Sequence, residues 1–277
     1  MVTFGKLFPQ EKNISGFNLT ASILLGLLVL YISYPLFGLA YIGGSINLAQ
    51  SLTRPEIINA FLLSMATATI STLILSIFGI PFAYALARFH FKWKFLLRLV
   101  VIIPLVLPPL ASGTMLLGAF GPYSFLGRTI PIDFTQTILG IIIAQTYVAS
   151  PFIILPSQAA FEAVPEKYEI IARVLGKKQS TMFFKVSLPL AKTGIIVGLL
   201  MAWIRSIGEL GATLMMAYNP HTISIQIFED NAIGGLRQAV SGIILVILLS
   251  ILAIIMFYIT RRKARHAVLK IGGTERY

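Results

Sequence analysis

The chain has 277 residues, of which 57% are hydrophobic and only 12% are charged, whereas soluble domains carry about 25% charged residues. It contains no cysteine, which excludes a disulfide framework, a thiol nucleophile and an iron–sulfur site. The three histidines are scattered without metal-ligand spacing, so we expect no metal site and no catalytic residue in this chain. A composition this apolar is typical of a membrane protein.

The apolar residues are gathered in six blocks. Each block reaches or exceeds the roughly 20 residues that cross a hydrocarbon core about 30 Å thick. So many nearly uncharged runs of this length do not occur in a soluble core. We therefore predict an all-α polytopic membrane protein with six transmembrane helices and a single domain, residues 1–277. The predicted spans are 19–42, 57–87, 99–120, 137–159, 194–217 and 239–260.

The basic residues alternate between the connections. Eighteen of the 22 Lys and Arg residues lie in the two tails and in the second and fourth connections, the latter being 161–193. The first, third and fifth connections hold one each, at Arg54, Arg128 and Arg237. Because cytoplasmic loops are enriched in Lys and Arg, both termini and 161–193 are predicted to be cytoplasmic. The net charge of +12 then reflects topology and attraction to anionic lipid, and we expect no nucleic-acid partner.

Prolines interrupt the third and fourth blocks. Pro104, Pro108 and Pro109 fall in the third block, and Pro151 and Pro156 fall in the fourth. A proline leaves a backbone carbonyl unpaired, which hydrocarbon tolerates only beside a protein neighbour or a watered cavity. Two interpretations stay open: these prolines kink helices for packing, or they mark helices that line a pathway.

The fifth block combines small residues with two charges. Gly194, Gly198 and Ala202 recur every four residues and allow another helix to approach closely. Arg205 and Glu209 are spaced i, i+4 within the same apolar run. Because unpaired charges in a membrane are costly, we expect them to pair with each other or with a neighbouring helix. A contact between Arg205 and a transported anion is the alternative.

The connection 161–193 contains a short amphipathic pattern. Residues 165–175 have the periodicity of a helix with one apolar stripe, and Gly176 follows as a left-handed cap. Such a helix is suited to lie in the headgroup region, to pack against its own chain or to fill a groove on another protein. The stripe consists of Tyr168, Ile171, Ala172 and Leu175.

The spacing in this connection resembles a family motif. Permease subunits of binding-protein-dependent ABC importers carry a coupling-loop motif of the form EAA, three residues, Gly, nine residues, I-x-L-P. Ala172, Gly176, Val186 and Leu188-Pro189 stand at the matching spacing. The motif's Glu position is Ile170 here, and Glu169 stands one residue earlier.

This resemblance implies the fold of a type I ABC importer permease whose loop docks on a cytoplasmic ATPase. The chain has no G-x-x-x-x-G-K-[ST] motif, so we expect ATP and Mg²⁺ to be bound by the partner subunit. The chain itself is then a non-catalytic subunit without a cofactor of its own. The docking residues implied are Glu166, Tyr168, Glu169, Ile171, Ala172, Arg173, Leu175 and Gly176.

Residues 201–222 read MAWIRSIGELGATLMMAYNPHT, which resembles the corresponding span of molybdate/tungstate permeases. The second and third blocks are also similar to that family, so the resemblance covers about 57–235. It implies a homodimer in the cell membrane, two ATPase subunits and an extracytoplasmic oxyanion-binding protein. Sulfate permeases share a similar G-E-[FY]-G element, so a sulfate or thiosulfate permease is the alternative.

Two further functions were weighed. An ion-gradient-driven carrier would need ionisable relays in several spans, whereas Arg205 and Glu209 are the only such pair deep in a span. A membrane scaffold without transport is not distinguished by sequence. For a transporter, we expect small and hydroxyl-bearing residues of the third and fifth spans to line the pathway. The predicted pathway or gate residues are Ser112, Thr114, Arg205, Ser206, Gly208, Glu209, Gly211 and Thr213.

Overall fold

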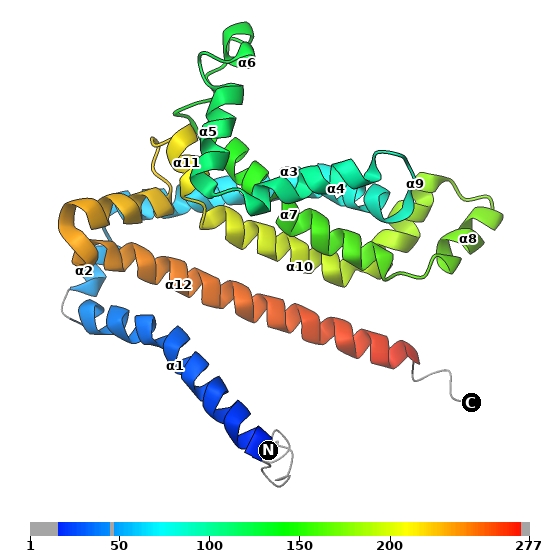
Figure 1. Ribbon diagram of the computed structural model, residues 1–277, viewed down its shortest axis with the longest axis horizontal. Helices are drawn as coiled ribbons and strands as arrows, with labels where there is room; N and C mark the ends of the chain where they lie inside the picture. The colour runs from blue at the N-terminus through cyan, green and yellow to red at the C-terminus, as the bar shows by residue number, and fades with distance from the viewer. Residues whose placement is uncertain (1–15, 45–46, 273–277) are drawn as a thin grey trace. The chain divides into compact units, whose positions relative to one another are not determined.

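The computed structural model describes residues 16–44 and 47–272, and this part of the chain is helical without a strand (Figure 1). It forms two compact units, residues 1–48 and residues 49–277. The helices are α1 (Gly16–Gly43), α2 (Leu48–Leu52), α3 (Pro55–Arg88), α4 (Lys94–Val106), α5 (Pro109–Phe120), α6 (Phe125–Thr129), α7 (Ile138–Glu162), α8 (Lys167–Val174), α9 (Gln179–Met182), the π-helix η2 (Phe183–Ser187), α10 (Leu188–Ile207), α11 (Gly211–Met216) and α12 (Ile223–Gly272).

Helix α1 makes up nearly all of the described part of the first unit. Its segment Leu19–Gly43 is apolar and long enough to cross a bilayer, and none of the residues in its most apolar window is buried. The predicted block 19–42 lies inside it. The basic residues Lys6 and Lys12, on which the orientation of the N-terminal tail depends, lie outside the described residues.

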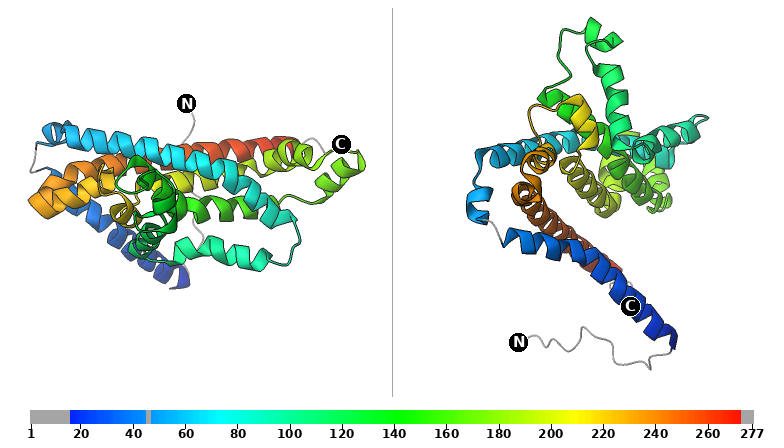
Figure 2. Two further views of the ribbon diagram at one scale, coloured as in Figure 1. Left: turned by 90° about the horizontal axis from the view of Figure 1, so that it is seen from above. Right: turned by 60° about the vertical axis from the view of Figure 1, so that its left-hand side comes forward.

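The second unit is built on α3, α7 and α10, which run side by side in Figures 1 and 2. Small residues let α10 approach α7 closely, as predicted. A Cβ at Gly194 would stand 2.5 Å from the Cβ of Ala160, and one at Gly198 would stand 3.2 Å from the carbonyl oxygen of Ile153. Ala202 of the same stripe is fully buried. The loop holding α8 lies at one end of this bundle, and α11 lies at the other.

The block 99–120 is not a straight span. It is divided between α4 and α5, which are bent by 117° at a break of a few residues. Leu107 and Pro108 occupy the break with extended backbone. Two successive prolines, Pro108 and Pro109, supply no N–H groups and disfavour helix in the preceding residue, so the helix must stop here. Five helices of the described chain are long and apolar enough to cross a membrane, or six if this bent pair counts as one span.

The block 194–217 is also interrupted. The apolar helical segment begins earlier, at Gln179, and α10 ends at Ile207. After the break, α11 packs against α5 with almost no space between the backbones. A Cβ at Gly211 would stand 2.6 Å from the Cβ of Pro109. The predicted span therefore combines the larger part of α10 with α11, a separate short helix that packs against α5.

Helix α12 is two helices joined at Gly235, whose φ of 67° is in the left-handed region. The carboxylate of Asp230, before the bend, accepts hydrogen bonds from Gln226 at 3.0 Å and from Gln238, after the bend, at 3.2 Å. Arg54, at the start of α3, donates to both oxygens of Asp230 at 3.0 Å. This network holds the two parts of α12 against the start of α3, and the predicted block 239–260 lies in the second part.

The contact between α5 and α11 gives a test of the packing. A Cβ at Gly113 would stand 2.7 Å from the Cα of Ala212, whereas nothing lies within 4 Å at Gly118 of the same helix. Gly113→Ala should therefore lower stability by about 1–3 kcal/mol through overpacking. The control Gly118→Ala should be neutral or slightly stabilising, because alanine favours the helix. Thermal melting of the detergent-solubilised protein measures both, and equal melting temperatures would contradict the close approach.

Candidate functional site

The loop between α7 and α10 carries α8, which ends in a Schellman motif. Gly176 has a φ of 72°. The N–H of Lys177 donates to the carbonyl of Ala172 at 3.0 Å, and the N–H of Gly176 donates to that of Arg173 at 2.9 Å. These two bonds satisfy carbonyls at the end of the helix. The predicted left-handed cap at Gly176 is confirmed.

One side of α8 presents apolar side chains to the outside of the molecule. Val174 is 82% exposed and Leu175 is 70% exposed. Contiguous exposed apolar residues of this kind mark interaction sites. Ala172, which was predicted to be in the stripe, is only half-exposed and lies toward the chain. We call this surface the apolar face; it consists of Tyr168, Ile170, Ile171, Val174 and Leu175.

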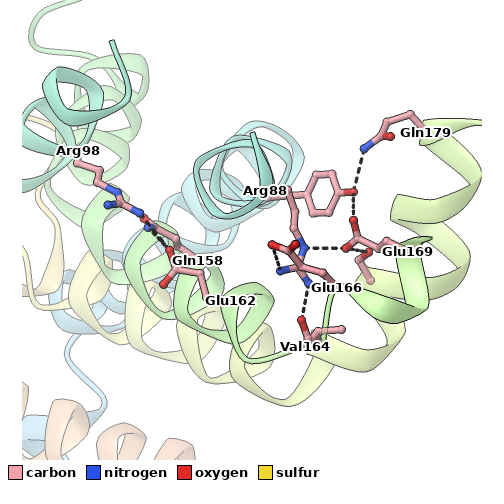
Figure 3. A network of polar contacts seen from close by, with 10 residues as sticks. Arg88, Arg98, Gln158, Glu162, Val164, Glu166, Glu169 and Gln179 are labelled. Carbon is pink, nitrogen blue, oxygen red and sulfur yellow. Dashed lines mark hydrogen bonds and ion pairs between the residues drawn. The ribbon is translucent and has the colours of Figure 1, made fainter. Parts of the chain in front are cut away.

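The opposite side of α8 is attached to the bundle through Glu169 (Figure 3). This side chain accepts hydrogen bonds from Ser187 Oγ at 2.6 Å, from Arg88 Nε at 2.8 Å and from the Tyr84 hydroxyl at 3.1 Å. The Tyr84 oxygen in turn accepts from Gln179 Nε2 at 3.0 Å. We call Glu169, Tyr84, Arg88 and Ser187 the Glu169 hub.

Glu169 is only 4% exposed, so its ionisation depends on these partners. Burial alone would raise the pKa of Glu169, but hydrogen bonds from Ser187, Arg88 and Tyr84 and the charge of Arg88 outweigh it and lower the pKa. The carboxylate is therefore charged at neutral pH, and its contribution to stability is lost only as pH falls through this lowered pKa. Because Glu169 is buried, it does not belong to an exposed docking surface, contrary to the prediction.

The other predicted docking residues remain accessible. Glu166 and Arg173 are exposed, as are Tyr168, Ile171 and Leu175 of the apolar face. Glu166 lies 3.9 Å from Arg88, and its side chain is 66% exposed. The carbonyl of Val164 accepts a hydrogen bond from Arg88 at 2.6 Å. Arg88 therefore also fixes the segment that leads into α8.

A π-turn brings Ser187 to the hub. η2 spans Phe183–Ser187, and the N–H of Leu188 donates to the carbonyl of Phe183, five residues back. Single π-turns are rare in proteins as a whole, but those that exist often lie at functional sites. Nothing in the local spacing predicts this turn.

Sequence reasoning also missed Arg88, Ile170 and Val174. Arg88 was counted only as a topology signal because it lies 81 residues from Glu169. Ile170 and Val174 are spaced i, i+4, and that spacing was a signal for a second apolar row.

A second polar contact joins the start of α4 to the end of α7. Glu162 accepts from Arg98 at 3.1 Å and from Gln158 Nε2 at 2.8 Å, as Figure 3 shows. The side chains of Arg98 and Glu162 are about equally exposed, at 41% and 46%. An ion pair this exposed contributes little stability, on the order of 0–1 kcal/mol. It lies on the side of α7 that is away from α8.

At the break between α10 and α11, Arg205 and Glu209 form an ion pair, which confirms the predicted pairing. Glu209 is 1% exposed, and its second oxygen accepts from the N–H of Ala212 at 2.7 Å. That bond satisfies one free N–H in the first turn of α11. The carboxylate therefore pairs with the end of one helix and caps the next.

The remaining predicted pathway residues divide into two groups. Ser112, Ser206 and Thr213 are fully or almost fully buried, and their hydroxyls make no hydrogen bond within the described part of the chain. Thr114 is instead exposed, and its hydroxyl donates to Leu110 of its own helix. Gly211 is packed against Pro109, whereas a Cβ at Gly208 would make only an ordinary contact, 3.7 Å from the carbonyl oxygen of Ile204. The structure thus brings neutral hydroxyls of α5, α10 and α11 into the interior.

Residues 77–266 match the family model of the binding-protein-dependent transport system inner membrane component. The chain belongs to this family. It is therefore a multi-span membrane subunit of a transport system, which agrees with the apolar helices and with the loop that carries α8.

Members of this family from archaea match most of the chain. It is 37% identical to a probable molybdenum ABC transporter permease protein of Haloferax volcanii, over 85% of this chain and 87% of the relative. It is also 37% identical to a molybdate/tungstate transport system permease protein of Pyrococcus furiosus, over 83% and 89% respectively. A crystal structure of a bacterial alginate ABC transporter with a periplasmic protein contains a chain with the same fold. The TM-score is 0.69 at 15% identity, covering 91% of this chain and 95% of that one.

The pair at the helix break gives a second test. Arg205→Ala leaves the buried Glu209 carboxylate without its cation, which should cost about 3–5 kcal/mol. Glu209→Ala should cost less from the charge itself, because the side chain of Arg205 is 25% exposed and reaches water. The double variant should be more stable than the sum of the two effects predicts, with a coupling of about 0.5–3 kcal/mol. Melting of the purified protein measures this, and strict additivity would contradict the pairing.

Proposed function

We propose that this chain is the permease subunit of an ATP-driven importer for molybdate or tungstate. The observation that carries the proposal is the long match to archaeal permeases named for these oxyanions, together with the apolar face on α8. A tetrahedral dianion needs a path through a low-dielectric layer, and a helical subunit with buried neutral donors provides one. The chain performs no covalent chemistry in this role.

The energy source is a separate ATPase that binds the apolar face. The sequence has no P-loop, so ATP and Mg²⁺ bind to that partner. An amphipathic helix that inserts its apolar side into a groove is a common mode of protein recognition. We propose a homodimer of this chain with two ATPase subunits, fed by an extracytoplasmic oxyanion-binding protein.

The end that carries α8 faces the cytoplasm in this proposal. Arg173, Lys177 and Lys178 are exposed there, whereas the opposite end holds the Arg54–Asp230 pair, in which the cation is neutralised. Positive charge is retained on the cytoplasmic side of membrane proteins. The protein is thus a multi-pass protein of the cell membrane with both termini in the cytoplasm.

Specificity for the oxyanion resides mainly in the binding protein. The buried hydroxyls of Ser112, Ser206 and Thr213 are neutral donors and bind an anion only weakly. Arg205, which precedes Ser206 in α10, is already paired with Glu209. Weak binding along the path favours release, since firm binding midway would hold the ion in the membrane.

An ion-gradient carrier is less well supported by the geometry. Each fully buried acidic side chain of the described chain has an arginine partner: Glu169, Glu209 and Asp230. Each of these carboxylates is held in an ion pair with arginine, so none is left free to act as a relay between spans. The three acids therefore have structural roles, and ATP remains the energy source in this proposal.

The cap of α8 tests the docking. Gly176→Val places a β-branched residue in the left-handed region at a cost of about 1–2 kcal/mol, although space is available around it. We expect a folded permease that co-purifies with much less ATPase and transports little. Gly176→Asn is the control, because asparagine tolerates this conformation, and it should retain both. Normal ATPase recovery with Gly176→Val would contradict the docking role.

Transport itself tests the substrate. In proteoliposomes containing the permease, its ATPase and its binding protein, ATP should drive uptake of molybdate and tungstate. Exchange of the ligand pocket of the binding protein should shift the preference while the permease is unchanged. Uptake of sulfate in place of both would establish the alternative oxyanion. Rejection of an ion that the docked binding protein holds and releases normally would place selectivity in the permease and contradict the proposal.

A further inference from the structure

We propose that Glu169 is a positioning residue that joins α8 to α3 and α10, so that movement of the docked helix is passed to both. This inference rests on the proposed function, because it assigns a role within ATP-driven transport. It also reassigns Glu169 from contact with the ATPase to the transmission of movement inside the permease.

Helix α8 has few attachments to the bundle besides Glu169. Helix α8 has eight residues, and Glu169 is the only one that is buried. The flanking connections are short stretches outside any helix, Ala163–Glu166 and Leu175–Lys178. A helix that buries one residue has few contacts to hold its orientation. The hub therefore decides whether α8 moves with the bundle or independently of it.

The groups that donate hydrogen bonds to Glu169 come from two other parts of the bundle. Tyr84 and Arg88 lie in the last two turns of α3, and Ser187 ends the π-turn that leads into α10. Their bonds to Glu169 span 85, 81 and 18 residues of sequence. One carboxylate thus connects three elements that the chain itself joins only distantly.

The hydrogen bonds to Glu169 are short and shielded from water. The bonds from Ser187 and Arg88 are 2.6 and 2.8 Å long, as expected for hydrogen bonds to an ionised group. The side chains of Arg88 and Glu169 are each 6% exposed, so water does not compete for the pair. A force on α8 therefore displaces the end of α3 and the start of α10 together.

Geometry separates this role from docking. The apolar face and Glu169 lie on different sides of α8, so a change at Glu169 leaves the exposed surface chemistry intact. Glu162, at the end of α7, offers a matched control. It has the same side chain, is 46% exposed and accepts hydrogen bonds from Arg98 and Gln158, but it belongs neither to the hub nor to the predicted docking residues.

The first experiment measures coupling with the assembled complex in proteoliposomes. Glu169→Gln should retain co-purification with the ATPase and most of its ATP hydrolysis, while the number of oxyanions imported per ATP falls about tenfold. Glu162→Gln should behave as the native protein in all three measurements, because its exposed ion pair with Arg98 lies outside the hub. Loss of ATPase binding with Glu169→Gln alone would make Glu169 a docking residue and overturn the inference. An unchanged transport ratio would overturn it as well.

The second experiment needs no substrate. The chain has no cysteine, so pairs of introduced cysteines can be spin-labelled directly in the complex in nanodiscs. Arg173→Cys with Lys192→Cys reports the distance from α8 to α10, and Arg173→Cys with His90→Cys reports the distance to the end of α3. Glu169→Gln should broaden both distance distributions, whereas Glu162→Gln should broaden neither.

Milder variants keep the test valid if Glu169→Gln fails to assemble. Ser187→Ala should broaden only the distance to α10, and Tyr84→Phe should broaden only the distance to α3. A merely structural role would not produce this selective pattern. Unchanged distributions in both would overturn the inference. If the native complex imports no oxyanion but the distances respond as described, the proposed function fails while the mechanical role of Glu169 stands.

Discussion

An ionised carboxylate inside a membrane protein needs a cation within reach, because its desolvation is otherwise too costly. The described chain buries three acidic side chains, and each is paired with an arginine. Each pair lies where the chain leaves regular helix: beside a π-turn, at the break after α10 and before the bend in α12. Where the backbone hydrogen bonds of a helix are interrupted, a charge pair holds the helix end in place. The pairs are Glu169 with Arg88, Glu209 with Arg205, and Asp230 with Arg54.

Between these three points, the bundle is held by close packing of small residues. Gly194 and Gly198 bring α10 against α7, and Gly113 brings α5 against α11. Such contacts depend on shape and are not directional, whereas the charge pairs are directional and hold the helix ends. Close packing and the fixing of helix ends are thereby assigned to different residues.

The elements were predictable where the signal is local. Block length identified the apolar helices, glycine spacing identified the contact of α10, and Gly176 identified the cap of α8. The prolines of the third block indicated a kink but not a bend of 117°, and the break after Ile207 was missed, because a hydropathy block records composition and does not show where the backbone turns. The hub was missed for a different reason: Arg88 and Glu169 are 81 residues apart, and only the packing of α3 against α7 brings them together. Periodicity placed Glu169 on the correct helix and outside the apolar stripe, but the family resemblance then counted it among the docking residues.

The break after α10 divides the apolar block 194–217 into two parts that move with different helices. A displacement that enters at Ser187 travels along the 20 hydrogen-bonded residues of α10 and stops at Ile207, since no helical ladder continues beyond it. The next helix, α11, is seated on α5 and follows that helix instead. The helices α10 and α11 are thus two separate rigid elements with three residues between them. When α10 tilts and α11 stays on α5, the spacing between the two helices changes, so a rotation at the end of the bundle that carries α8 becomes a rearrangement at the opposite end.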